Sequence, residues 1–174
     1  AVADASEIPV VLYNVPGRTG CDLLPDTVAV LSSHENIIGL KESVADESRW
    51  QALYPLASPG FSLLSGDDET FVRAMIGGAH GVISVASNAV PATFARICRY
   101  VSEQNFDAAL ALDGQLQELY AFLGVEPNPV PIKAIMKLLG FGRGLRLPLL
   151  SLSDDYTGKA DEMTDLCKTI EQSM

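Results

Sequence analysis

Lys41 is the residue whose place in the sequence best suits it to do chemistry. It lies near the end of residues 37–43, Ile-Ile-Gly-Leu-Lys-Glu-Ser, which we interpret as a buried strand. Because side chains alternate along a strand, Gly39, Lys41 and Ser43 share one face, and Gly39 leaves space beneath the lysine. If this face is the interior of an α/β fold, the Lys41 ammonium loses hydration there, which disfavours its charged form. A neutral amine can attack a carbonyl and form a Schiff base.

Tyr13 and Arg18 come from the stretch that precedes this strand. Residues 8–15 read as another strand, ended by Pro16-Gly17 and followed by a loop over residues 18–20. Neighbouring strands lie about 4.8 Å apart, so side chains at their ends can meet over one substrate. The guanidinium of Arg18 suits a planar carboxylate. The competing interpretations are a solvated lysine, a core tyrosine with its hydroxyl at the rim, and a solvated loop arginine.

Strand and helix patterns alternate four times in the first part of the chain. This alternation is typical of βαβ units and predicts an α/β fold with a parallel sheet. Right-handed crossovers place the functional loops at the carboxyl ends of the strands, where Tyr13, Lys41, Gly66 and Ile83 are expected. The predicted strands are residues 8–15, 37–43, 61–64 and 82–85, and the predicted helices are 25–33, 46–56, 69–76 and one that ends near 102.

Beyond residue 102 the sequence predicts helices without strands. A long amphipathic helix is expected over 106–123, a rigid proline-rich connector over 126–131, and further helices over 132–139 and 155–172. We therefore divide the chain into a strand-bearing part, residues 1–102, and a helical part, residues 103–174.

Composition and charge exclude several classes of partner. The 174 residues are 48% apolar and carry a net charge of −10, which argues against binding to nucleic acid or to anionic membranes. No apolar run approaches the roughly 20 residues that span a bilayer. Three widely spaced cysteines without a Cys-x-x-Cys pair favour a reduced, cytoplasmic protein, and two isolated histidines predict no metal site. Since the chain lacks an initiator Met, we expect it to begin within a larger protein.

Five motifs in one order resemble the dihydrodipicolinate synthase family. They are Tyr-Asn-Val-Pro-Gly-Arg-Thr-Gly at 13–20, Gly-Leu-Lys-Glu-Ser at 39–43, Leu-Ser-Gly-Asp-Asp at 64–68, Gly-Ala-His-Gly-Val-Ile-Ser at 78–84 and Val-Glu-Pro-Asn-Pro at 125–129. The resemblance implies a TIM (β/α)8 barrel, of which this chain covers about the last four β/α units and the C-terminal helices. It also implies a cytoplasmic lyase that condenses pyruvate with L-aspartate 4-semialdehyde on the diaminopimelate route to lysine.

The resemblance also implies roles for five residues. Lys41 matches the lysine that forms the imine with pyruvate, and Tyr13 matches the tyrosine that shuttles protons during imine formation. Arg18 matches the arginine that binds the carboxylate of the aldehyde substrate. Gly66 lets the chain approach the site closely, and Ile83 offers its backbone carbonyl. No cofactor is implied besides the covalent pyruvate imine, and family members assemble as homo-oligomers, either dimers or tetramers.

Two other functions stay open on the sequence alone. One is another pyruvate-dependent aldolase of the same superfamily, against which Arg18 argues because relatives such as N-acetylneuraminate lyase lack it in this motif. The other is a non-catalytic half-barrel, since a closed barrel needs eight strands and only four are predicted here. The loop that binds the pyruvate carboxylate and the rest of the family's proton relay are also absent from this sequence, so the chain alone is expected to be poorly active.

Overall fold

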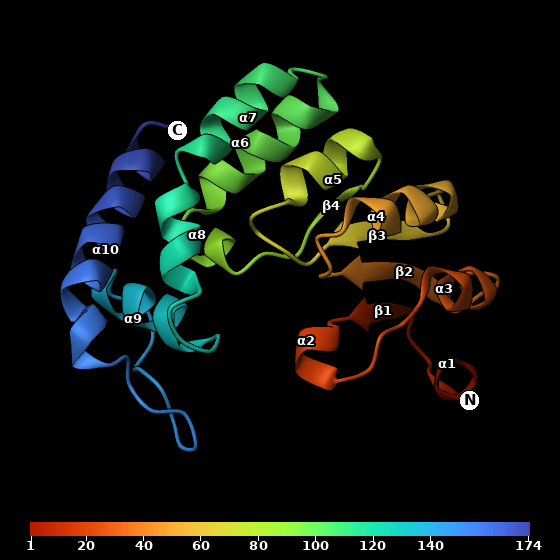
Figure 1. Cartoon of the computed structure of the whole chain (residues 1–174), viewed down its shortest axis with the longest axis horizontal. Coiled ribbons are helices and arrows are strands. Elements are labelled where there is room, and N and C mark those ends of the chain that lie inside the picture. The colour runs from red at the N-terminus through yellow and green to blue at the C-terminus, as the bar shows by residue number, and fades with distance from the viewer. The chain divides into compact units, whose positions relative to one another are not determined.

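Four parallel strands form one sheet in the computed structural model, which describes all 174 residues. The sheet lies in the first of two compact units, residues 1–84, and its strand order follows the chain (Figure 1). Each neighbouring pair of strands is parallel, which confirms the parallel sheet predicted from the alternating pattern. The strands are β1 (Val10–Asn14), β2 (Ile37–Glu42), β3 (Ser62–Ser65) and β4 (Gly81–Val82).

Short helices connect the strands, and the sequence explains where several of them begin. Pro25 occupies the first turn of α3, and the Asp46 carboxylate caps α4 by accepting a hydrogen bond from the Arg49 amide at 2.9 Å. The predicted loop at residues 18–20 is wrong in part. Pro16 instead starts a one-turn helix, which Gly20 ends with a φ of 66°. The helices of this unit are α1 (Val2–Ala5), α2 (Pro16–Thr19), α3 (Pro25–Leu31), α4 (Glu47–Leu53), η1 (Tyr54–Leu56) and α5 (Phe71–Gly77).

The two faces of the sheet differ in burial. On one face Leu40 and Leu63 are fully buried, whereas on the other Tyr13 is 51% exposed. Gly39 and Lys41 share one face, as alternation along the strand predicted, and this is the open face that carries Tyr13. Gly39 does not leave space beneath the lysine, however, because a Cβ at this position would lie 2.5 Å from the backbone oxygen of Ser62. The glycine instead lets β2 and β3 approach each other closely.

The second unit, residues 85–174, contains helices only. The single helix predicted over 106–123 is wrong, because the chain breaks after Gly114. The amides of Gln115 and Leu116 bond to carbonyls three residues back, and this tighter turn buries Leu116 completely. The elements are η2 (Ala86–Asn88), α6 (Pro91–Ser102), α7 (Phe106–Gly114), α8 (Gln117–Leu123), α9 (Val130–Leu138), η3 (Asp154–Tyr156) and α10 (Thr157–Gln172).

Helix α6 packs with the other helices of the second unit. The Glu171 carboxylate of α10 accepts hydrogen bonds from the amides of Ala92 and Thr93, at 3.0 and 2.8 Å, and so caps α6. The boundary between the two compact units lies between Ser84 and Val85. The division at 102 follows the strand–helix repeat instead of the packing, and it stays a prediction. None of the helices is long and apolar enough to cross a membrane.

Candidate active site

Lys41 and Tyr13 meet on the open face of the sheet. They are direct partners in the parallel register of β1 and β2, and the Lys41 ammonium nitrogen lies 4.1 Å from the centroid of the Tyr13 ring. A cation at this distance from an aromatic ring is attracted by the electron-rich face. Tyr13 is exposed and Lys41 is half-buried, so a small molecule on this face can contact the amine and the phenol together.

Gly66 is required by the close approach of the chain to Lys41. Its amide donates to the Glu42 carbonyl at 2.7 Å, and its own carbonyl accepts from the Ser43 hydroxyl at 3.3 Å. A Cβ at position 66 would lie 2.3 Å from the Ser43 hydroxyl oxygen and 2.8 Å from Cε of Lys41. Only glycine leaves this lysine its present position. The close approach expected of Gly66 is therefore present, whereas its contact with substrate stays a prediction.

Arg18 and Ile83 lie at the same end of the sheet as Lys41, but neither side chain forms a hydrogen bond or an ion pair with it. Arg18 is exposed on α2, directly after β1, and forms no ion pair. Ile83 is 45% exposed directly after β4, and its amide donates to the Ser65 carbonyl at 2.8 Å. Their roles in binding substrate stay predictions.

A buried carboxylate, Glu42, lies on the opposite face of β2 from the neighbouring Lys41. Its side chain is fully buried and accepts hydrogen bonds from the Asn14 amide group at 3.0 Å, from the Val44 backbone amide at 2.8 Å and from the Arg49 guanidinium at 3.2 Å. Burial raises the pKa of Glu42, although the bonds from Val44 and Asn14 and the charge of Arg49 act in the opposite direction.

Arg49 joins this carboxylate to the segment that follows α2. The guanidinium also donates to the Leu23 carbonyl at 3.1 Å and pairs with the Asp22 carboxylate. Asn14 holds the same segment, since its carbonyl oxygen accepts from the Leu23 amide at 2.9 Å and its amide group donates to Asp22 at 3.0 Å. We call Glu42, Asn14, Arg49 and Asp22 the buried polar network.

Sequence reasoning missed this network. The available signal was the placement of Asn14 and Glu42, two polar residues that directly follow Tyr13 and Lys41 in apolar strands. Nothing in the sequence distinguishes Arg49 from an ordinary surface arginine on an amphipathic helix.

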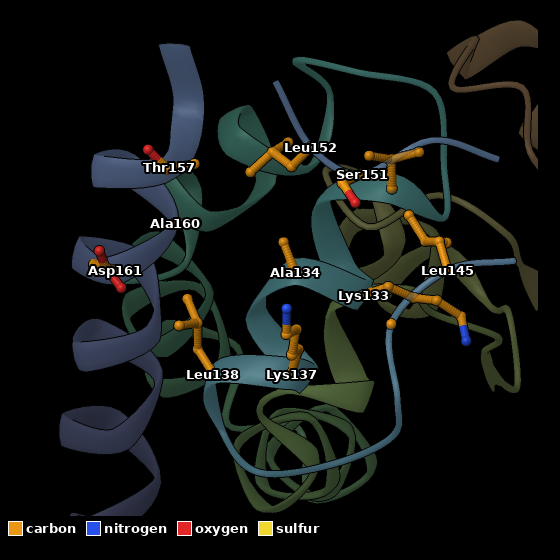
Figure 2. A pocket seen from close by; sticks show the side chains of 12 residues that line it. Lys133, Ala134, Lys137, Leu138, Leu145, Ser151, Leu152, Thr157, Ala160 and Asp161 are labelled. Atoms are coloured by element: carbon orange, nitrogen blue, oxygen red, sulfur yellow. The ribbon is translucent and has the colours of Figure 1, made fainter. Parts of the chain in front are cut away.

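Two other lysines line a hollow in the second unit. The hollow has a volume of about 260 Å³ and lies between α9, α10 and the segment that joins them. Figure 2 shows the Lys133 and Lys137 ammonium groups pointing in different directions from α9. Both side chains are exposed, and neither forms the contact with an aromatic ring that Lys41 has. No group of three His, Cys, Asp or Glu side chains is arranged to hold a metal ion.

A model of the dihydrodipicolinate synthetase family matches residues 1–166. The chain belongs to this family. A similar relative is the 4-hydroxy-tetrahydrodipicolinate synthase of Stenotrophomonas maltophilia (strain K279a), which is 51% identical over 94% of the chain and 55% of its own length. The chain thus spans about half the length of the curated relatives it matches.

Solved structures of the family share the fold. A chloride-inhibited dihydrodipicolinate synthase from Acinetobacter baumannii, complexed with pyruvate, superposes with a TM-score of 0.90 at 35% identity, over 96% of this chain and 58% of that one. A synthase described as the first monomeric variant gives a TM-score of 0.90 at 31% identity, over 96% and 57% of the two chains. The α/β fold is therefore that of the family's TIM barrels over somewhat more than half of their length.

Proposed function

We propose that this chain carries the imine-forming part of a 4-hydroxy-tetrahydrodipicolinate synthase, a lyase that condenses pyruvate with L-aspartate 4-semialdehyde. The observation that carries the proposal is the pairing of Lys41 with Tyr13 across two neighbouring strands. It supplies an amine nucleophile and a phenol hydroxyl on one accessible face. Membership of the family and the pyruvate complex of the Acinetobacter baumannii relative support pyruvate as the first substrate.

Lys41 acts as the nucleophile in this proposal. Its neutral amine attacks the ketone carbon of pyruvate, and the resulting carbinolamine loses water to give an imine that is covalently bound to the enzyme. Protons must reach the carbonyl oxygen as it becomes an alcohol and then leaves as water. Tyr13 carries these protons, because its hydroxyl belongs to the ring that packs against the lysine.

The second substrate is selected by Arg18 in the same proposal. Its guanidinium pairs with the carboxylate of aspartate semialdehyde, for which the forked geometry of arginine is suited. Gly66 allows the substrate and the Lys41 side chain to share the space beside β3. Ile83 presents its backbone carbonyl at the end of β4.

We also propose that the chain supplies the last four β/α units of the barrel and the helices that follow them. Four parallel strands in chain order, followed only by helices, support this placement. A closed barrel has eight strands, so the other four come from residues outside this sequence. We expect the complete protein to form a homo-oligomer, because a family member is described as the first monomeric variant.

Trapping of the imine tests the proposal. The full-length protein is treated with pyruvate and borohydride, and the labelled peptide is identified by mass spectrometry. We expect one reduced pyruvate adduct, at Lys41, and none in Lys41→Arg, because a guanidinium stays protonated. A label at Lys133 or Lys137, the exposed lysines of α9, would overturn the assignment.

A further inference from the structure

We propose that Arg49 is a positioning residue, which fixes the segment that carries Arg18 relative to the strands that carry Lys41 and Tyr13. The inference rests on the proposed function for what Arg18 binds, and on the contacts of the buried polar network for how the segment is held.

Arg49 connects two parts of the chain that are far apart in sequence. Its guanidinium contacts Glu42 at the end of β2 and, through Asp22 and Leu23, the segment between α2 and α3. The side chain is 10% exposed, so these contacts are largely shielded from water. Arginine is suited to this work, because its rigid fork can donate to several acceptors at fixed angles.

Glu42 makes the position of Arg49 hard to change. The carboxylate is fully buried, and removal of a partner would leave a buried charge uncompensated. Asn14 donates to the same carboxylate at 3.0 Å from β1. Since Asn14 and Glu42 are bonded directly to Tyr13 and Lys41 in the chain, the network sets the two strand ends that carry the proposed catalytic pair.

Arg18 depends on this network because its own side chain has no partner in the structure. At the end of its segment that adjoins β1, the Arg18 backbone amide donates a hydrogen bond to the Val15 carbonyl at 2.8 Å. The far end is held where Leu23 bonds to Asn14 at 2.9 Å and to Arg49 at 3.1 Å. Release of the far end frees residues 16–23 to move, whereas Lys41 remains in the middle of the sheet.

Arg49→Lys in the full-length protein tests the inference. Lysine keeps the positive charge beside Glu42 but cannot reproduce the fork that also holds Leu23 and Asp22. We expect KM for aspartate semialdehyde to rise about tenfold, the effect of losing a charge-assisted contact. Borohydride trapping of pyruvate at Lys41 should change less than about twofold. Trapping does not require aspartate semialdehyde, so a loss that affects only the binding of this second substrate leaves it unchanged.

A double variant separates positioning from a general structural role. If Arg49 acts through Arg18, the combination Arg18→Ala with Arg49→Lys should be no worse than Arg18→Ala alone. Additive losses, or equal losses in pyruvate trapping and in use of the aldehyde, would overturn the proposal. Arg73→Lys is the matched control, because Arg73 is exposed on α5 in the same unit.

Hydrogen exchange provides a readout that does not depend on activity. The amides of residues 16–23 should exchange faster in Arg49→Lys than in the wild type or in Arg73→Lys. Unchanged exchange there would refute the positioning role.

Asp22→Asn is the second variant, in case Arg49→Lys does not fold. It removes the charge of Asp22, whose side chain is 36% exposed and pairs with Arg49, and it should give a smaller increase in exchange of the same residues. If the wild type failed to trap pyruvate, only the proposed function would be contradicted. Whether Arg49 holds residues 16–23 would still be decided by the hydrogen-exchange result.

Discussion

The Lys41 ammonium nitrogen lies 4.1 Å from the centroid of the Tyr13 ring, across the pairing of β2 with β1. This contact explains how a tyrosine that is 51% exposed is held in place without burial. It also restricts where the amine can go, because Gly66 closes the other side of the lysine stem. The pair therefore has a defined geometry on a face that is open to small molecules.

Tyr13→Phe tests the role of the hydroxyl. The variant keeps the ring beside Lys41 and removes only the group proposed to carry protons. General acid–base groups typically contribute about a hundred- to ten-thousandfold, so we expect imine formation in the full-length protein to slow by that order. The melting temperature should change little, because Tyr13 is 51% exposed and the variant keeps its ring. A large loss of stability with near-normal turnover would show that Tyr13 serves packing instead.

Gly66→Ala tests the space that Lys41 needs. The added methyl group would lie 2.8 Å from Cε of Lys41 and 2.3 Å from the Ser43 hydroxyl oxygen, so the lysine side chain must move. We expect pyruvate trapping to fall at least about tenfold, whereas stability should drop by less than about 1 kcal/mol, because the atoms that must move are side-chain atoms of Ser43 and Lys41 rather than a packed core. Gly60→Ala is the control, because nothing lies within 4 Å of a Cβ there. Normal trapping in Gly66→Ala would show that the lysine does not need its present position.

Arg18→Ala tests selection of the second substrate. Loss of a charge-assisted contact costs about 1.5–3 kcal/mol, which corresponds to about ten- to a hundredfold in use of aspartate semialdehyde. Trapping with pyruvate should be largely intact, since Arg18 forms no hydrogen bond with Lys41 or with its partner Tyr13. Steady-state kinetics and trapping on the same preparation of full-length protein measure both steps. Equal losses in both would indicate that Arg18 supports the structure of the segment rather than the substrate.

The sequence predicted the sheet well because local patterns determine it. The apolar run at 37–43 and its neighbours indicated four strands in chain order, and each strand lies within two residues of its predicted start. Alternation along β2 correctly placed Lys41 on the opposite face from Leu40 and Glu42. The faces of a strand follow from its two-residue period alone, so no knowledge of distant contacts was needed.

Features that depend on distant contacts were missed. Gly39 serves the approach of Ser62 from another strand, which only the pairing of β2 with β3 reveals. The turn after Gly114 buries Leu116 completely, and the amphipathic pattern, which carries no information on this burial, predicted one continuous helix. Arg49 reaches Asp22 over 27 positions in the chain, and helical periodicity cannot anticipate such a partner.

Glu42→Gln tests how burial acts on the carboxylate of the network. Because burial raises the pKa of Glu42 above its ordinary value of 4.5, the folded state binds this proton more tightly than the unfolded state does. The contribution of Glu42 to the free energy of unfolding should therefore be largest below pH 4.5 and fall as the pH rises through the raised pKa. Glutamine does not titrate, so the wild-type value minus the Glu42→Gln value should fall over this window and then stay constant.

Urea unfolding followed by the fluorescence of Trp50 measures this difference. Trp50 is the single tryptophan and is 3% exposed in the same unit as Glu42, so its emission reports unfolding around the network. Glu35→Gln, at an exposed position, controls for the loss of one negative charge. If the difference instead rose with pH, the charged form of Glu42 would be the one favoured by folding. Pairing with Arg49 at 3.2 Å would then outweigh the cost of burying the carboxylate.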